Sequence, residues 1–142
     1  MTPILRAVRR ITVHCPIRPE TLGAVAAGSV DALAADPGIA PLLALIESST
    51  EFGDFGHYKG VCEIGLGLEA FTPQAGSNPA LGAAGRRSMS PTATLTTYVS
   101  TDIDGARLAA LVGVLAARHP WEVPVIEVAD VRLADRRTQA SV

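Results

Sequence analysis

The sequence predicts an α+β fold in which a split β-α-β-β-α-β chain forms an antiparallel sheet with its helices on one face. Two patterns predict this fold: short segments alternate apolar and polar residues, and longer segments repeat apolar residues at helical spacing. These segments follow one another in the order strand, helix, strand, strand, helix, strand. A length of 142 residues, with 48% hydrophobic and 4% aromatic content, indicates one domain with a mostly aliphatic core.

The first predicted strand covers residues 10–15, where apolar and polar residues alternate before a proline. This spacing puts Ile11, Val13 and Cys15 on one face of the strand. Cys15 and Cys62 match no metal-ligand spacing and lie in apolar surroundings. We therefore expect both cysteines to be free, buried thiols.

The first predicted helix begins at Pro19, which suits a first helical position, and runs to Leu33. Residues 36–38, Asp-Pro-Gly, end it, and residues 41–47 predict a short additional helix within an extra helical segment over 36–50. The apolar face of the first helix consists of residues at helical spacing: Leu22, Val25, Ala26, Val30 and Leu33.

The clearest strand pattern covers residues 59–71. Glycines weaken the interior of a strand, so they often mark a place where another backbone, a ligand or another subunit approaches. We therefore expect a contact at the face that contains the glycines. One face carries Cys62, Ile64, Leu66, Leu68 and Ala70, and the other carries Glu63, Gly65, Gly67 and Glu69.

The remaining elements are a strand over 92–99, a second long helix and a last strand over 123–131. Asp102-Ile103-Asp104-Gly105 supplies capping oxygens for the helix, and His119-Pro120 ends it. The resulting order of elements is that of the ferredoxin-like arrangement. The apolar stripe of this helix consists of Leu108, Leu111, Val112 and Leu115.

The ferredoxin-like arrangement leaves one face of the sheet without helices. Glycine, threonine, tyrosine and valine alternate on this face, and few charged residues lie among them. A surface of small and apolar residues seldom stays exposed to water. We therefore expect other copies of the chain to cover it.

Three stretches carry a resemblance to a known family. They read Gly-His-Tyr-Lys-Gly-Val at 56–61, Phe-Thr-Pro-Gln-Ala-Gly-Ser-Asn-Pro-Ala-Leu-Gly at 71–82, and His-Pro-Trp-Glu-Val-Pro at 119–124. Together they resemble the YqfO-type domain that is inserted in NGG-interacting-factor-three-like proteins. The last stretch is also similar to CutA, the divalent-cation-tolerance protein. The similarity covers roughly residues 51–133.

The resemblance implies one CutA/P-II-like domain over residues 1–142, with a core over about 10–133 and a long loop over 72–91. It also implies a homo-oligomer, a trimer, with its sheets packed together inside and ligand sites in the clefts between subunits. The sequence has no counterpart of the metal-binding parts of the larger relatives, so their hydrolase chemistry is not expected here. Glu69 departs from the family, because glycine often stands at this position.

Glu63, Glu69, His57 and Tyr58 are the candidate catalytic residues. Both glutamates lie on the face that contains the glycines, and we expect them to converge with the other two residues and with Glu122 in a cleft. A desolvated carboxylate beside an imidazole suits proton transfer near neutral pH. In the alternative interpretation, both glutamates face solvent or meet an arginine of another subunit.

Arg86, Arg87, Asn78, Glu122 and His119 are the candidate ligand-binding residues. The arginine pair lies in the long loop, which the resemblance equates with the effector loop of P-II-like proteins. It offers charge to an anion, although the sequence contains no phosphate-loop motif. His119 has a second interpretation, as a structural residue that bonds nearby carbonyl groups between a helix end and a proline.

The formal net charge of −2 gives no reason to expect nucleic acid or an anionic membrane as a partner. The longest apolar stretch, residues 108–117, is too short to span a bilayer, so we expect a cytoplasmic protein. No cofactor is required by any motif. A divalent metal is left open, although the histidines and glutamates show no ligand spacing.

Two functions remain open from the sequence. The first is a homo-oligomeric regulatory domain that binds a small molecule or an ion, such as an anion, in clefts between subunits. The second is a small acid-base enzyme, for example a lyase, cyclase or isomerase, that uses the same cleft. A purely structural scaffold is a third interpretation, favoured if the long loop is disordered and no pocket exists.

Overall fold

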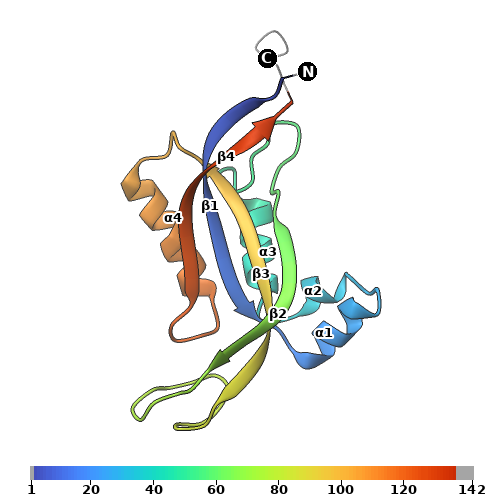
Figure 1. Ribbon diagram of the computed structural model, residues 1–142, viewed down its shortest axis with the longest axis vertical. Coiled ribbons are helices and arrows are strands. Elements are labelled where there is room, and N and C mark those ends of the chain that lie inside the picture. Colours follow the sequence, from blue (N-terminus) through green and yellow to red (C-terminus); the bar gives the residue numbers. More distant parts are fainter. Residues whose placement is uncertain (1, 137–142) are drawn as a thin grey trace.

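The computed structural model describes residues 2–136, which form a four-stranded sheet and four helices. The strands lie in the order β2-β3-β1-β4, and every neighbouring pair is antiparallel (Figure 1). This topology confirms the predicted split β-α-β-β-α-β fold, with three helices in the first crossover. The elements are β1 (Ile4–Pro16), α1 (Pro19–Ala26), α2 (Ala32–Ala35), α3 (Ala40–Ser48), β2 (Glu63–Phe71), β3 (Ser88–Ser100), α4 (Gly105–Arg118) and β4 (Val125–Asp135).

The core lies between the helices and one face of the sheet. Ile11, Val13 and Cys15 of β1 point into it and are at most 1% exposed, as their alternation predicts. Leu95 of β3 and Leu115 of α4 belong to the same cluster and are fully buried. Figure 1 shows α3 behind the sheet, so the opposite face of the sheet is free of helices.

Three strands begin or end further out than the sequence patterns indicate. β1 starts at Ile4 and β4 ends at Asp135, because these two strands pair from Ile4 to His14. β3 starts at Ser88, so the predicted loop over 72–91 is in fact the shorter tip of a β2–β3 hairpin. Backbone pairing extends a strand through residues whose side chains do not alternate, and a pattern of side chains cannot reveal this. The hairpin projects beyond the helices at the lower end of Figure 1.

The prediction of one helix from Pro19 to Leu33 is wrong, because the helix ends at Ala26. Gly28 has φ of 103°, in the left-handed region, and its N–H donates to the carbonyl of Val25 at 2.9 Å. The next N–H donates back to Ala24 at 2.9 Å, which completes a Schellman motif. A four-residue helix, α2, then returns Leu33 to the core. In the described part of the chain, no helix is long and apolar enough to cross a membrane.

Asp36 holds the connection after α2 together. Its carboxylate is 2% exposed and accepts hydrogen bonds from the Arg18 N–H at 2.8 Å, the Thr21 hydroxyl at 2.6 Å and the Gly38 N–H at 2.8 Å. Burial by itself raises the pKa of Asp36, but these hydrogen bonds stabilise the charged form and hold the pKa below its ordinary value. The start of α1 is therefore tied to the turn before α3.

We expect Asp36→Ala to lower the free energy of unfolding by about 3 kcal/mol, because buried donors lose a charged acceptor. Asp31→Ala is a matched control: Asp31 is exposed and its side chain caps nothing, so a change within about 0.5 kcal/mol is expected. Urea unfolding of each variant measures both values. Equal losses in the two variants would contradict the role of the buried carboxylate.

The contribution of Asp36 to the free energy of unfolding decreases at acidic pH. Its pKa is lower in the folded chain than the ordinary 3.8, so the unfolded chain binds a proton first as the solution becomes acidic. The contribution is present above the ordinary pKa and is lost as the pH falls through the lower folded value. The stability difference between the original chain and Asp36→Ala should therefore shrink below that pH.

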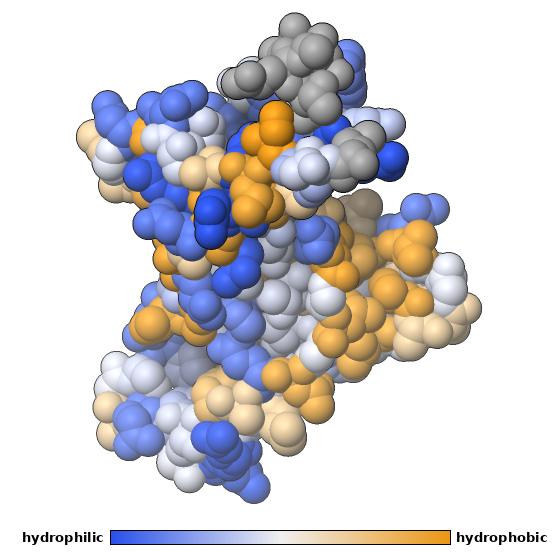
Figure 2. Space-filling model, turned by 45° about the horizontal axis from the view of Figure 1, so that its top comes forward, coloured by the Kyte–Doolittle hydropathy of each residue, from blue (hydrophilic) through white to orange (hydrophobic). Residues whose placement is uncertain are grey.

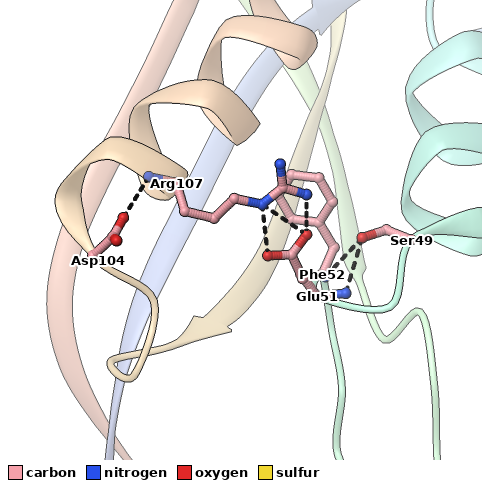
Figure 3. A network of polar contacts seen from close by, with 5 residues as sticks. All are labelled: Ser49, Glu51, Phe52, Asp104 and Arg107. Atoms are coloured by element: carbon pink, nitrogen blue, oxygen red, sulfur yellow. Dashed lines mark hydrogen bonds and ion pairs between the residues drawn. The ribbon is translucent and has the colours of Figure 1, made fainter.

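The segment that joins α3 to β2 is anchored on α4 (Figure 3). The Ser49 hydroxyl accepts the N–H groups of Glu51 at 3.0 Å and Phe52 at 3.1 Å. The Glu51 carboxylate accepts hydrogen bonds from Arg107 Nε at 2.9 and 3.1 Å and an additional one from its Nη2. Asp104 caps α4 by accepting the Arg107 N–H at 2.7 Å, as its sequence position predicts. These contacts hold Phe52 in the core, where it is 1% exposed.

The same segment then continues the sheet beyond the start of β2. The Gly53 N–H donates to the Tyr98 carbonyl at 2.8 Å, and the Thr97 hydroxyl donates to the Val61 carbonyl at 2.9 Å. Phe55 packs on the ring of Tyr98 with centroids 6.0 Å apart. The segment therefore occupies the edge of β3 that β2 leaves unpaired.

Candidate functional site

A cavity of about 330 Å³ lies between the β2–β3 hairpin and the turn that joins α4 to β4. Phe71 at the end of β2 and Trp121 in that turn meet edge to face, with ring centroids 5.1 Å apart. A volume of this size suits a small organic ligand. The described residues that line the cavity are Glu69, Phe71, Thr72, Pro73, Gln74, Ser77, Pro79, Ala80, Leu81, Trp121, Glu122 and Val123.

His119 positions the turn that carries Trp121. Its Nε2 lies 2.6 Å from the His14 carbonyl and its Nδ1 accepts the Trp121 N–H at 3.0 Å, so the neutral ring must carry its proton on Nε2. Burial lowers the pKa of His119 despite the hydrogen bond to His14 and the nearby charge of Glu69. Both ring nitrogens are engaged, which supports the structural interpretation of this residue.

The loop of the hairpin is tied to the same turn by Glu122. Its Oε2 accepts the Asn78 N–H at 2.7 Å, across 44 positions of the sequence. Within the loop, the Gly85 N–H donates to the Pro73 carbonyl at 2.7 Å. The loop therefore folds back on itself and closes one side of the cavity.

Glu69 brings a carboxylate to the cavity from the face of β2 that carries the glycines. One of its oxygens, Oε1, is buried and accepts no hydrogen bond from any residue that the structure describes. Burying an acceptor oxygen without a hydrogen-bond donor destabilises the folded chain by about 1–3 kcal/mol, and by more when the group is charged. This acceptor is the least satisfied polar atom of the site.

The structure brings together some of the predicted site residues and separates others. Glu69 and Glu122 line the cavity, and Asn78 and His119 contact its walls. Arg86 and Arg87 are exposed in the hairpin loop and are not among the lining residues. The cavity was thus expected near the long loop, but its described lining has no arginine.

The four candidate catalytic residues do not converge within one chain. His57 and Tyr58 are exposed and line a separate hollow of about 380 Å³ with residues of β1 and the end of β4. Glu63 is exposed at the opposite end of β2 from Glu69, and its carboxylate accepts the Tyr98 hydroxyl at 3.3 Å. The predicted cleft of carboxylates beside His57 is therefore absent from the single chain.

Phe71 and Trp121 form the aromatic wall of the cavity, and neither was among the candidate site residues. Both are aromatic in a chain with only 4% aromatic residues, and both lie in the stretches that carry the family resemblance. The scarcity of aromatic residues was the signal that could have identified them. The contact between the two rings could not be predicted, because it joins two segments 50 positions apart.

The described residues contain no group of three or more side chains able to hold a metal ion. His14 approaches Glu127 at 3.6 Å on the face of the sheet that has no helices, and this pair is partly exposed. Burial, together with the smaller effect of the Asp36 charge, raises the pKa of Cys15 to about 12, so this thiol stays protonated. None of these groups joins the cavity.

The face of the sheet without helices is lined by small residues at its centre. Thr94 lies between His14 of β1 and Gly65 of β2, and Gly67 pairs with Thr92 in the next row. A Cβ atom added at Gly65 or Gly67 would meet no atom within 4 Å. Figure 2, viewed from this side, shows a pale band of intermediate hydropathy over the middle of the molecule.

Comparisons with known proteins support the fold. No protein-family profile matches the sequence, and no curated protein matches it significantly. Among solved structures, the chain is similar to the crystal structure of a Bacillus cereus protein related to NIF3, with a TM-score of 0.57 and 13% sequence identity. The match covers 95% of this chain and 28% of that one, so this chain spans less than a third of its structural neighbour.

Proposed function

We propose that this chain is a non-catalytic binding domain for a small molecule and that it acts as a homo-oligomer of the CutA/P-II-like type. The observation that carries the proposal is the cavity of about 330 Å³ between the hairpin and the turn after α4. Apolar walls with a few convergent polar groups are typical of small-molecule sites. The NIF3-related structural neighbour supports the further proposal that the chain corresponds to the YqfO-type inserted domain.

The geometry favours binding over acid-base catalysis. Proton transfer needs an imidazole or carboxylate with a free position facing the substrate. The ring of His119 uses both nitrogens in contacts with the protein, at 2.6 and 3.0 Å. His57 and Tyr58 line a different hollow from Glu69. An enzyme that used Glu69 together with His57 and Tyr58 would therefore have to assemble these residues across subunits.

The cavity can be tested with the fluorescence of Trp121, the only tryptophan in the sequence. A panel of small amines, carboxylates, alcohols and nucleotides is titrated into the full chain. We expect at least one compound to change the emission saturably. The same compound should raise the unfolding free energy by about 2.7 kcal/mol at one hundred times its dissociation constant. A panel that changes neither signal would refute the binding function.

The face of the sheet without helices supports the oligomer. Thr94 and its neighbours are half-buried, while Gly65 and Gly67 are exposed and leave room for an approaching backbone. In addition, Leu66 and Leu68 on the other side of β2 are 39% and 62% exposed. Exposed apolar residues on an unpaired edge strand favour association. We propose that copies of the chain, three by the family resemblance, cover these surfaces.

Gly65→Arg tests the proposed interface, because an added Cβ atom at Gly65 meets no atom of its own chain within 4 Å and the longer side chain would block an approaching subunit. We expect the fold to survive and the mass from light scattering to fall from that of an oligomer to that of one protomer at micromolar concentration. Gly113→Arg on the exposed side of α4, where an added Cβ atom also meets nothing within 4 Å, is the matched control. An original chain that is already a monomer, or a variant that stays oligomeric, would refute the proposed interface.

A further inference from the structure

We propose that the cavity selects an organic cation, a ligand that carries an ammonium or guanidinium group on an apolar, single-ring body. The inference rests on the proposed binding function and names the ligand class of that site. It is carried by the charge of the lining, the unpartnered oxygen of Glu69 and the aromatic wall, each of which comes from a different segment or property of the chain.

The charge of the lining has one sign. Glu69 and Glu122 are the ionisable side chains among the described lining residues, and no lysine, arginine or histidine lines the cavity with them. Arg86 and Arg87 are exposed in the hairpin loop. Two carboxylates without a facing cation disfavour an anionic ligand and attract a positive one.

The hydrogen bonding of the two carboxylates shows where the cation would lie. Glu122 already uses Oε2 to accept the Asn78 N–H at 2.7 Å, so this group holds the loop. Glu69 Oε1 is buried and has no donor in the described chain. The ring of His119 is close enough to interact electrostatically with Glu69, but burial keeps this ring neutral and its nitrogens contact His14 and Trp121. No donor among the described residues therefore offsets the negative charge of the Glu69 carboxylate, and an ammonium group of a ligand beside this carboxylate would offset it.

The remaining walls suit an apolar body and a cation together. Phe71 and Trp121 pack edge to face at 5.1 Å, and Pro79 and Leu81 complete the apolar side. A cation near the face of a tryptophan or phenylalanine ring gains about 0.5–2 kcal/mol. A metal ion would fit less well, because hard cations take six to eight oxygen ligands. The cavity offers two carboxylates, and the described residues form no cluster of three metal-binding side chains.

Three probes of nearly the same shape test the charge preference without any change to the protein: phenethylammonium, 2-phenylethanol and phenylacetate. Each is titrated into the full chain while the emission of Trp121 is recorded. We expect phenethylammonium to bind at least tenfold more tightly than the alcohol and the carboxylate, since a charge-assisted hydrogen bond is worth at least that factor. Equal or tighter binding of the alcohol or the carboxylate would overturn the inference.

Glu69→Gln keeps the size of the side chain and removes its charge. We expect this variant to lose the tenfold preference for phenethylammonium while its oligomer mass and unfolding midpoint stay near those of the original chain. Glu127→Gln is the matched control, because Glu127 is 65% exposed on β4 and does not line the cavity. A preference that survives in Glu69→Gln, or that disappears equally in Glu127→Gln, would contradict the assignment of Glu69.

The results of these titrations distinguish the cation inference from the proposed binding function on which it rests. Binding of neutral or anionic compounds in preference to amines overturns the cation inference and leaves the binding domain intact. Absence of binding by the whole panel, including the three probes, removes both. Saturable binding of phenethylammonium that depends on Glu69 supports both.

Discussion

Phe52→Ala is expected to lower the free energy of unfolding by about 3–5 kcal/mol, the range for truncating a fully buried aromatic side chain. Phe52 is 1% exposed and is the largest fully buried side chain of a core made otherwise of smaller, mostly aliphatic residues. Its backbone is fixed by the Ser49 hydroxyl and by the Glu51–Arg107 ion pair on α4 (Figure 3). These contacts limit how far the surroundings can close over the lost ring.

Urea unfolding at a fixed protein concentration measures the effect, because an oligomer makes stability depend on concentration. Phe55→Ala in the same segment is the matched control. Phe55 is half-buried and packs on Tyr98 at 6.0 Å, so its loss should be clearly smaller than that of Phe52. Similar losses for the two phenylalanines would mean that Phe52 does not anchor the core.

Gly53→Ala is expected to have the second large effect, about 3 kcal/mol or more. Gly53 has φ of 64°, and a Cβ atom there would lie 2.3 Å from both the N and the O of Val61. Left-handed backbone is strained for alanine, and an overpacked site adds about 1–3 kcal/mol because backbone must shift. The shift would also disturb the hydrogen bond from Gly53 to Tyr98 at 2.8 Å, which joins the segment to the sheet.

Gly28→Ala isolates the part of this effect that comes from backbone strain. Gly28 has φ of 103°, and an added Cβ there would meet no atom within 4 Å. We expect about 1 kcal/mol for this control, measured by the same urea unfolding. If the two alanine variants lose equal stability, the close contact with Val61 contributes nothing and the prediction fails.

The strand faces and the second long helix were predictable because their signals are local. Alternation at period two assigned Ile11, Val13 and Cys15 to the core, and the structure buries all three. The same alternation put Gly65 and Gly67 on the opposite face, where they pair with threonines of β3. Residues 102–105 were expected to supply a cap for α4, and Asp104 does so at 2.7 Å. Each of these features depends on residues only a few positions apart.

The end of the first helix was missed because two local signals compete there. Leu22, Val25, Ala26, Val30 and Leu33 continue at helical spacing, yet Val30 is 64% exposed. Gly28 adopts a left-handed conformation and accommodates the Schellman motif, which stops the helix before that spacing is used. A glycine inside an apolar repeat allows either outcome. Packing of α2 against the core decides between them.

The sequence by itself determined the class of fold and the two faces of the sheet, and it singled out four candidate residues that lie at the cavity, namely Glu69, Asn78, His119 and Glu122. Only the tertiary structure decided that these four gather beside Phe71 and Trp121, and that His57 and Tyr58 lie elsewhere. The physical reason is distance along the chain. Periodicity and capping act within one or two turns, whereas the cavity forms where a hairpin meets a turn some 40–50 positions away, through contacts that exist only after the sheet has paired.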